Sequence, residues 1–165
     1  MAATEPATTE LHDTAKTLVA DDKGILAADE SSGTIEKRFD SIGLESTEEN
    51  RRTYRDLLFT TPELEQFVSG VILYDETIRQ SSADGTPFAE LLAGRGIIPG
   101  IKVDTGAKDL AGGPGEKVTE GLDGLRERLQ DYREHGARFA KWRAVITIGE
   151  GLPTGYCIAV NAHAL

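Results

Sequence analysis

Charged side chains stand at the ends of several apolar stretches in this chain. Asp29 follows Ile-Leu-Ala-Ala, Lys102 lies in Gly-Ile-Lys-Val-Asp, and Lys141 and Arg143 flank a tryptophan in Phe-Ala-Lys-Trp-Arg. Strands buried on both faces are almost wholly apolar, and alternation along a strand predicts that Lys141 and Arg143 share one face. Clustered ammonium groups lower a lysine pKa and yield a neutral amine nucleophile, which can form an imine with a ketone. With a carboxylate to move protons and cations to bind phosphate, the pattern predicts carbonyl chemistry on a phosphorylated small molecule.

An alternative interpretation makes these charges structural ion pairs that fill a barrel interior or a sheet edge. Buried pairs stabilise less than apolar packing does, so several of them at strand ends favour a functional site. The basic pairs Lys37-Arg38 and Arg51-Arg52 are, by spacing alone, typical of solvated helix faces. The glycine-rich segment 111–116 lacks the Lys-Ser/Thr of a P-loop and predicts a turn. The histidines lack metal-ligand spacing, so neither a metal nor a cofactor is expected.

Composition narrows the class of protein. The chain has 165 residues, a formal net charge of −10 and 39% hydrophobic residues, which predicts one folded domain. The acidic balance argues against nucleic acid or an anionic membrane as the main partner. A single cysteine excludes an internal disulfide framework. No apolar run approaches a membrane span and no signal peptide is evident, so a cytoplasmic location is expected.

Hydrophobic periodicity alternates between short apolar runs and helical stripes. Residues 1–10 are expected to form a disordered tail. Helices are predicted over 9–20, 35–42, 46–58, 86–94, 122–136 and 155–165, and strands over 24–28, 69–74, 96–104 and 137–148. This alternation implies parallel strands with right-handed crossovers. Two architectures remain open, a doubly wound flavodoxin-like sheet and about half of a (β/α)₈ barrel of roughly 250 residues. Sequential strand order would exclude the first, because a doubly wound sheet reverses its order.

Motifs spread over most of the chain resemble class I fructose-bisphosphate aldolases. They run from about residue 11 onward, in family order, as GILAADESSGTIEKR, ENRRTYRDLL, GVILYDET, GIKVDTG, LAGGPGE, EGLDGLRERL and FAKWRAVITIGEGLPT. The resemblance implies an α/β fold, a (β/α)₈ TIM barrel, of which residues 1–165 form the first four β/α units of one domain. It also implies reversible cleavage of fructose 1,6-bisphosphate to dihydroxyacetone phosphate and glyceraldehyde 3-phosphate through a lysine Schiff base. No metal takes part, and the full-length protein is expected to be a cytoplasmic homotetramer.

The resemblance also assigns roles to individual residues. Asp29 matches an aspartate that helps to position the imine-forming lysine and supports carbon–carbon cleavage. Lys141 matches a lysine that lies beside the nucleophile and lowers its pKa. Among the substrate-binding positions, Arg38 and Arg51 match arginines that bind the substrate phosphates, and Lys102 matches a pocket lysine near the reacting hydroxyls. Arg143 matches a further active-site arginine.

The family's imine-forming lysine and its glutamate acid/base residues lie on later strands than those of this chain. The 165 residues alone are therefore expected to be marginally stable, with unpaired sheet edges, and to lack cleavage activity. The alternative is a truncated, non-catalytic family member that binds a phosphosugar or associates with full-length subunits.

Overall fold

The computed structural model describes residues 5–165, and its internal contacts divide the chain into two compact units. Unit 1 comprises the described residues up to Lys102 together with 132–140, and unit 2 comprises 103–131 and 141–165. Of the tail expected over 1–10, residues 1–4 lie outside the described part, and a helix already begins at Glu5. Within residues 5–165, every helix is too short or too polar to cross a membrane.

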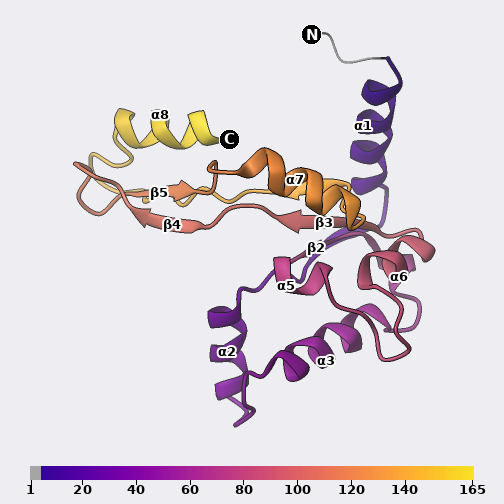
Figure 1. Ribbon diagram of the computed structural model, residues 1–165. Helices are drawn as coiled ribbons and strands as arrows, with labels where there is room; N and C mark the ends of the chain where they lie inside the picture. The colour runs from indigo at the N-terminus through magenta and orange to yellow at the C-terminus, as the bar shows by residue number, and fades with distance from the viewer. Residues whose placement is uncertain (1–4) are drawn as a thin grey trace. The chain divides into compact units, whose positions relative to one another are not determined.

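Unit 1 holds most of the helices and the four-stranded sheet (Figure 1). Its helices are α1 (Glu5–Leu18), α2 (Ser32–Asp40), α3 (Glu48–Phe59), α4 (Leu64–Phe67), α5 (Asp75–Ile78) and α6 (Phe88–Gly94). The strands of the sheet are β1 (Gly24–Ala27), β2 (Val68–Leu73), β3 (Ile98–Lys102) and β6 (Phe139–Lys141), whose last residue belongs to unit 2. Unit 2 contains β4 (Gly106–Asp109), β5 (Lys117–Glu120) and α8 (Gly155–Ala164), and α7 (Leu125–Glu134) crosses the division.

The order of the sheet is β1-β2-β3-β6, which is also the order of these strands in the chain. Strands β1 and β2 are parallel, as are β2 and β3. Arg138 N donates to the Pro99 carbonyl (2.8 Å) and Val103 N donates to that of Lys141 (3.1 Å), so β6 advances along β3 in the same direction. This sequential order contradicts the doubly wound alternative. It agrees with an open segment of a parallel barrel, in which β1 and β6 are the edges.

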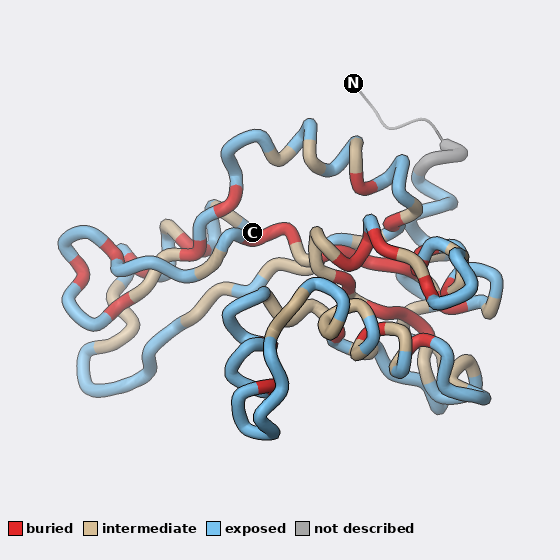
Figure 2. The backbone as a smooth tube through the Cα atoms, turned by 60° about the horizontal axis from the view of Figure 1, so that its bottom comes forward, coloured by how far each residue is buried: buried red, intermediate tan, exposed pale blue. Residues whose placement is uncertain are grey.

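Packing in unit 1 centres on the inner strands. Most residues of β2 and β3 are buried, whereas α2 is exposed along most of its length (Figure 2). The aromatic rings of Phe59 and Phe88 meet edge to face, with centroids 5.1 Å apart. At Gly100 in β3, a Cβ atom would overlap the ring of Phe139, the first residue of β6. Glycine is therefore required there so that the ring can lie against the backbone of the sheet.

Two predicted boundaries were wrong for local reasons. The fourth strand was predicted over 137–148, but β6 ends at Lys141 and the chain continues without regular structure to residue 148. The second helical boundary was predicted at residue 46, but α3 begins at Glu48 and its capping residue is Thr47, whose hydroxyl accepts from Asn50 N at 3.1 Å. The threonine hydroxyl satisfies one of the free N–H groups of the first turn.

Unit 2 is built on an antiparallel hairpin that the sequence did not predict. Strands β4 and β5 pair from Gly106 opposite Glu120 to Asp109 opposite Lys117, and the glycine-rich segment 111–116 connects them. Helix α8 lies along this hairpin (Figure 1). Asn161 attaches the helix to β5, because its Nδ2 donates to the Lys117 carbonyl (2.9 Å) and its Oδ1 accepts from Thr119 N (3.2 Å).

Candidate functional site

The carboxyl end of β1 carries two adjacent carboxylates. Ala28 N still bonds to β2, at the Ile72 carbonyl (3.0 Å), and the chain then leaves the sheet through Asp29 and Glu30. Glu30, only 9% exposed in its side chain, forms an ion pair with Arg38 of α2. Asp29 is half-buried and contributes to the electrostatic environment of a second guanidinium, that of Arg55 in α3. The loop after β1 is therefore bound to both α2 and α3.

Arg55 is the most deeply buried cation of unit 1, with 2% of its surface exposed. Its Nη2 donates to the backbone carbonyl of Glu30 (3.1 Å) and lies 3.0 Å from Glu30 Oε2, a charge contact rather than a second directed hydrogen bond. Its guanidinium carbon lies 5.1 Å from the centre of the Tyr54 ring, a cation–π distance. Burial lowers the pKa of Arg55, and the negative charge of Glu30 opposes that shift. Glu30 is thus the carboxylate that most strongly compensates this buried charge.

Arg51 comes from the same helix and forms a two-pronged pair with Glu76. Its Nε donates to Glu76 Oε2 (2.8 Å) and its Nη2 to Glu76 Oε1 (2.6 Å), while Nη1 donates to the Ser46 carbonyl (2.6 Å). The hydrogen bonds to Glu76 raise the pKa of Arg51. Arg38 differs, because 57% of its side chain is exposed. Of the two predicted phosphate-binding arginines, Arg38 is therefore the more accessible.

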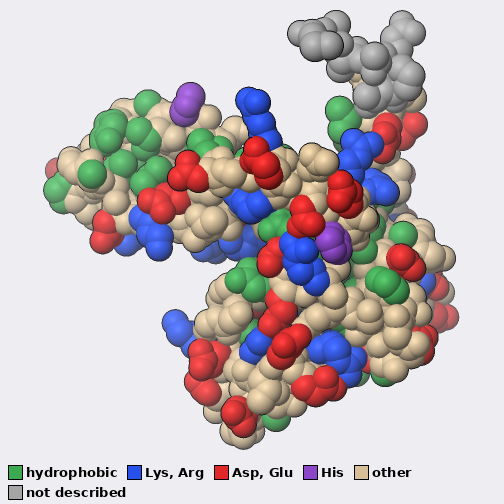
Figure 3. All heavy atoms as spheres, viewed as in Figure 1, with side chains coloured by type: hydrophobic (Ala, Val, Ile, Leu, Met, Phe, Trp, Pro, Cys, Tyr) green, Lys and Arg blue, Asp and Glu red, His purple; other side chains and the backbone are tan. Residues whose placement is uncertain are grey.

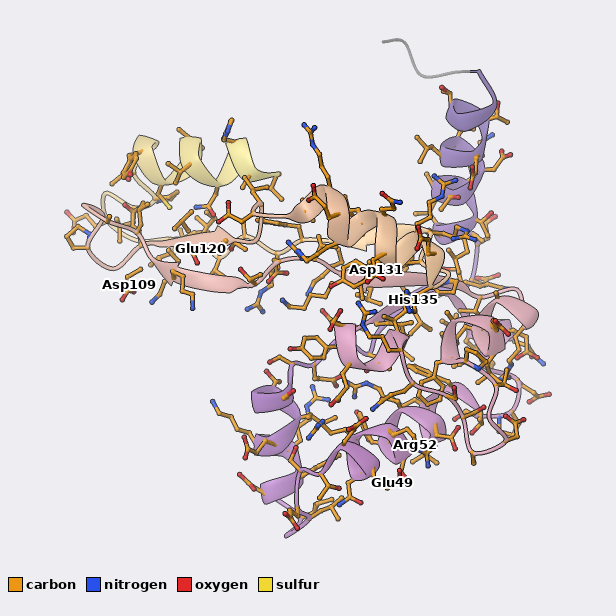
Figure 4. The ribbon with its side chains drawn as sticks, viewed as in Figure 1. Glu49, Arg52, Asp109, Glu120, Asp131 and His135 are labelled. Atoms are coloured by element: carbon orange, nitrogen blue, oxygen red, sulfur yellow. The ribbon has the colours of Figure 1, made fainter. Side chains whose placement is uncertain are left out.

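Acidic and basic side chains alternate over the surface of α2 and α3 (Figure 3). Glu49 and Arg52 lie side by side on α3 (Figure 4), and their side chains pair at 2.7 Å. The Arg52 hydrogen bonds hold the pKa of Glu49 below its usual range. Arg52 also donates to the Ser81 carbonyl at 3.3 Å, which links α3 to the segment after α5. These contacts give Arg52 a structural role, although it lies on a partly shielded face rather than on a solvated one.

The remaining predicted residues follow the ends of β3 and β6. Lys102 is the half-buried last residue of β3, in unit 1. In unit 2, Lys141 is the half-buried last residue of β6, and its carbonyl accepts from Val103 N. Arg143 lies beyond the strand, so the expectation that it shares a strand face with Lys141 was wrong. The Arg143 carbonyl accepts from Thr119 Oγ1 (2.8 Å), which places this exposed residue beside the hairpin instead.

Unit 2 has buried carboxylates of its own, and no sequence pattern indicated the more deeply buried of them. Glu116, 1% exposed, accepts from Thr154 N with Oε1 and from the Thr154 hydroxyl with Oε2, both at 2.7 Å. These hydrogen bonds lower the pKa of Glu116. Burial raises the pKa of the nearby Cys157 thiol, and the Glu116 charge adds to that effect. A buried thiol with a raised pKa is a packing residue rather than a nucleophile.

Sequence reasoning missed Glu30 and Arg55 as members of the site. Glu30 directly follows Asp29 in the quoted motif, and Arg55 follows Arg51 by four residues, which places both arginines on one helix face. That spacing was the available signal. Within the described part of the chain, no group of three or more His, Cys, Asp or Glu residues is arranged to hold a metal ion.

Comparison with known proteins gives a consistent family assignment. The family model for class-I fructose-bisphosphate aldolase matches residues 10–165. A probable fructose-bisphosphate aldolase class 1 from Xanthomonas campestris pv. campestris is 65% identical over 156 residues, which cover 94% of this chain and 47% of that protein. Fructose-bisphosphate aldolase 1 of Toxoplasma gondii is 57% identical over 158 residues, covering 94% and 44%. The chain thus spans about half the length of the curated relatives it matches.

A solved structure agrees with the sequence matches. Fructose-bisphosphate aldolase from Plasmodium falciparum, in complex with TRAP and a small-molecule inhibitor, superposes with a TM-score of 0.96 at 50% identity. The alignment covers 100% of this chain and 48% of that one. With the family model matching nearly the whole length, the conclusion is direct: this chain belongs to the class I fructose-bisphosphate aldolase family.

Proposed function

We propose that residues 1–165 are the N-terminal half of one (β/α)₈ barrel domain. The observation that carries this proposal is the sheet of sequential parallel strands, found in a chain that matches about half of each relative. An open parallel sheet leaves β1 and β6 with unpaired edges, which a barrel removes by closing. Four further β/α units would complete the eight that a TIM barrel requires.

The full-length protein, in this proposal, cleaves fructose 1,6-bisphosphate reversibly to dihydroxyacetone phosphate and glyceraldehyde 3-phosphate. A lysine beyond residue 165 attacks the ketone, loses water to form an iminium ion, and so provides a sink for the electron pair of the breaking C3–C4 bond. Asp29 positions that lysine and supports proton movement, and Lys141 keeps the amine neutral by charge repulsion.

The substrate carries two phosphate groups, and cations suited to them are already present in unit 1. We assign Arg38 and Arg51 to phosphate binding and Lys102 to the reacting hydroxyls, with Arg143 as a further substrate contact from unit 2. The exposed Arg38 guanidinium supports this assignment, since a planar guanidinium matches phosphate geometry. The full-length protein would work in the cytoplasm as a homotetramer, without a metal, a membrane or a nucleic-acid partner.

A split-enzyme experiment tests this function. The 165-residue chain is co-expressed with the C-terminal half of the Xanthomonas aldolase, and cleavage is followed in a coupled assay. Borohydride trapping with dihydroxyacetone phosphate then locates the imine. We expect turnover and a trapped lysine only in the complemented protein, and a loss of about 100-fold or more for Asp29→Asn. The Xanthomonas enzyme split at the same position is the control.

Two results would contradict the proposal. A lysine trapped in the 165-residue chain alone would place the nucleophile in the wrong half. If the split Xanthomonas enzyme were active and the hybrid were folded but inactive, the chain would not be a catalytic half. Phosphosugar binding by that inactive hybrid would instead support a non-catalytic family member.

A further inference from the structure

Three charged residues of unit 1 form a chain of contacts that runs from the interior to the surface. Arg55 is 2% exposed, the Glu30 side chain is 9% exposed, and the Arg38 side chain is 57% exposed. Glu30 lies between the two arginines, with Oε1 on Arg38 Nη1 and Oε2 3.0 Å from Arg55 Nη2. The Glu30 carboxylate is thus shared between two guanidinium groups, and the neighbouring Asp29 also acts on the charge of Arg55.

Arg55 is the fixed member of this cluster. Its Nη2 donates to the Glu30 backbone carbonyl, so it contacts the backbone as well as the side chain of that residue. Its Nε and Nη1 are buried without a hydrogen-bond partner. A buried guanidinium with unsatisfied donors retains its nearest carboxylate strongly, because losing that partner would leave an uncompensated charge in the interior. Arg55 therefore limits how far the Glu30 carboxylate can move toward the surface.

Arg38 is the member of the cluster that can bind an anion from solution. Its contacts with Glu30 and with the Tyr54 hydroxyl (3.4 Å) are both made through Nη1. The side chain is exposed enough for an anion to approach the rest of the guanidinium. A phosphate group that binds Arg38 is repelled by the adjacent Glu30 carboxylate and must share the positive charge of the guanidinium with it.

We propose that Arg55 is a positioning residue that sets the phosphate affinity of Arg38 by holding Glu30. The inference rests on the proposed function only in taking a phosphate group as the ligand. With Arg55 present, the Glu30 carboxylate interacts with both guanidinium groups, so Arg38 keeps enough positive charge to attract an anion. Without Arg55, Glu30 neutralises Arg38 fully and phosphate binds more weakly.

Substitutions at the two inner positions should have opposite effects. Glu30→Gln removes the competing charge and should strengthen binding of inorganic phosphate by about twofold to fivefold, whereas Arg55→Met should weaken it by a similar factor. In a Glu30→Gln background, Arg55→Met should change nothing, because the residue through which Arg55 acts has lost its charge. Arg55→Lys keeps the charge and should restore most of the affinity.

The measurement is a titration of the 165-residue chain with inorganic phosphate at fixed pH and ionic strength. It is followed by the Nε–Hε NMR signal of Arg38, which shifts when an anion binds that guanidinium. Arg52→Met is the matched control, because Arg52 lies on α3 with Arg55 but pairs with Glu49. The Arg52 variant should leave phosphate affinity unchanged.

Every outcome bears on the inference. Equal phosphate affinity of Glu30→Gln and the double variant supports it, even where Arg55→Met alone does not fold, because the double variant removes both buried charges together. The inference is wrong if the double variant binds phosphate more weakly than Glu30→Gln does. It is also wrong if the Arg38 NMR signal of the original chain does not shift when phosphate is added. Since phosphate binding needs no bond cleavage, an inactive hybrid in the split-enzyme assay would refute the proposed function and leave this result standing.

Discussion

Arg51 and Glu76 stand 25 positions apart in the chain and meet through two directed hydrogen bonds, Nε to Oε2 at 2.8 Å and Nη2 to Oε1 at 2.6 Å. This fork joins α3 to α5, which begins where β2 ends. An arginine engaged in this way is held in place before any substrate arrives. Its charge is shared with Glu76, so its role in phosphate binding depends on that partner.

Glu76→Gln should lower the free energy of unfolding by about 1 kcal/mol, because the half-buried Arg51 then loses its charged partner. Urea unfolding of the chain measures this loss. Glu49→Gln, at an exposed partner of Arg52, should cause no measurable change. Equal losses for the two variants would show that the Arg51 fork contributes no more than a surface pair.

Gly100→Ala should destabilise unit 1 by about 1–3 kcal/mol, because the new Cβ overlaps the rigid Phe139 ring. Thermal or urea unfolding measures the effect. Gly24→Ala is the matched control, since a Cβ at this strand position meets nothing within 4 Å. Adding Phe139→Leu to the Gly100 variant should recover part of the loss. Additive effects of the two changes would argue against the predicted overlap.

Arg95, directly after α6, binds to the last residue of α3 and to the segment that follows it. Its Nη1 donates to the Phe59 carbonyl and its Nη2 to that of Thr61, both at 2.8 Å. Arg95→Lys should cost about 1–2 kcal/mol of unfolding free energy, since an ammonium cannot serve both carbonyls in the same geometry. The midpoint of urea unfolding should fall at unchanged slope. Arg126→Lys, at an exposed arginine of α7, should leave the midpoint where it was.

Glu116 should make the attachment of α8 depend on pH. Its pKa is lowered in the folded chain by the Thr154 hydrogen bonds. Its stabilising contribution is therefore fully present above the ordinary glutamate pKa and is lost as pH falls through the lowered, folded-state pKa. Release of α8 would expose Cys157, the single cysteine of the chain.

Labelling of Cys157 with 4,4′-dithiodipyridine, which reacts in acid, measures that release. The rate should rise as pH falls through this range, and Glu116→Gln should give a high rate that is much less dependent on pH. The exposed Asp109 of the same hairpin (Figure 4) provides the control, because its pKa is also lowered, by its hydrogen bond with Lys117. Asp109→Asn should leave the labelling profile unchanged. A Glu116→Gln profile that matches the original chain would refute the attachment role.

Some elements could be predicted because their signals are local. The apolar runs that became β1, β2 and β3 are each dense enough in Ile, Val and Leu to indicate a strand, although only β2 and β3 are buried and β1, at the edge of the sheet, is largely exposed. The hairpin of β4 and β5 escaped prediction because Gly-Ala-Lys-Asp has no such run. Its residues extend only because their partner strand lies opposite them. The fourth strand was predicted to run over 137–148, which is too long, for the converse reason. The apolar residues beyond Lys141 have no neighbouring strand with which to pair.

Some residues of the candidate site could likewise be predicted from the sequence, and others could not. Asp29, Lys102 and Lys141 could be chosen from the sequence because each is a charge at the end of an apolar strand, and burial makes such charges unusual. The partners Glu30 and Arg55 could not be ranked, because nothing in a linear pattern distinguishes a buried arginine from a solvated one. The sequence by itself determined the family, the parallel strands and the charged residues at their ends. The tertiary structure alone decided which arginine is buried and which carboxylate it holds, because burial and pairing depend on segments that only folding brings together.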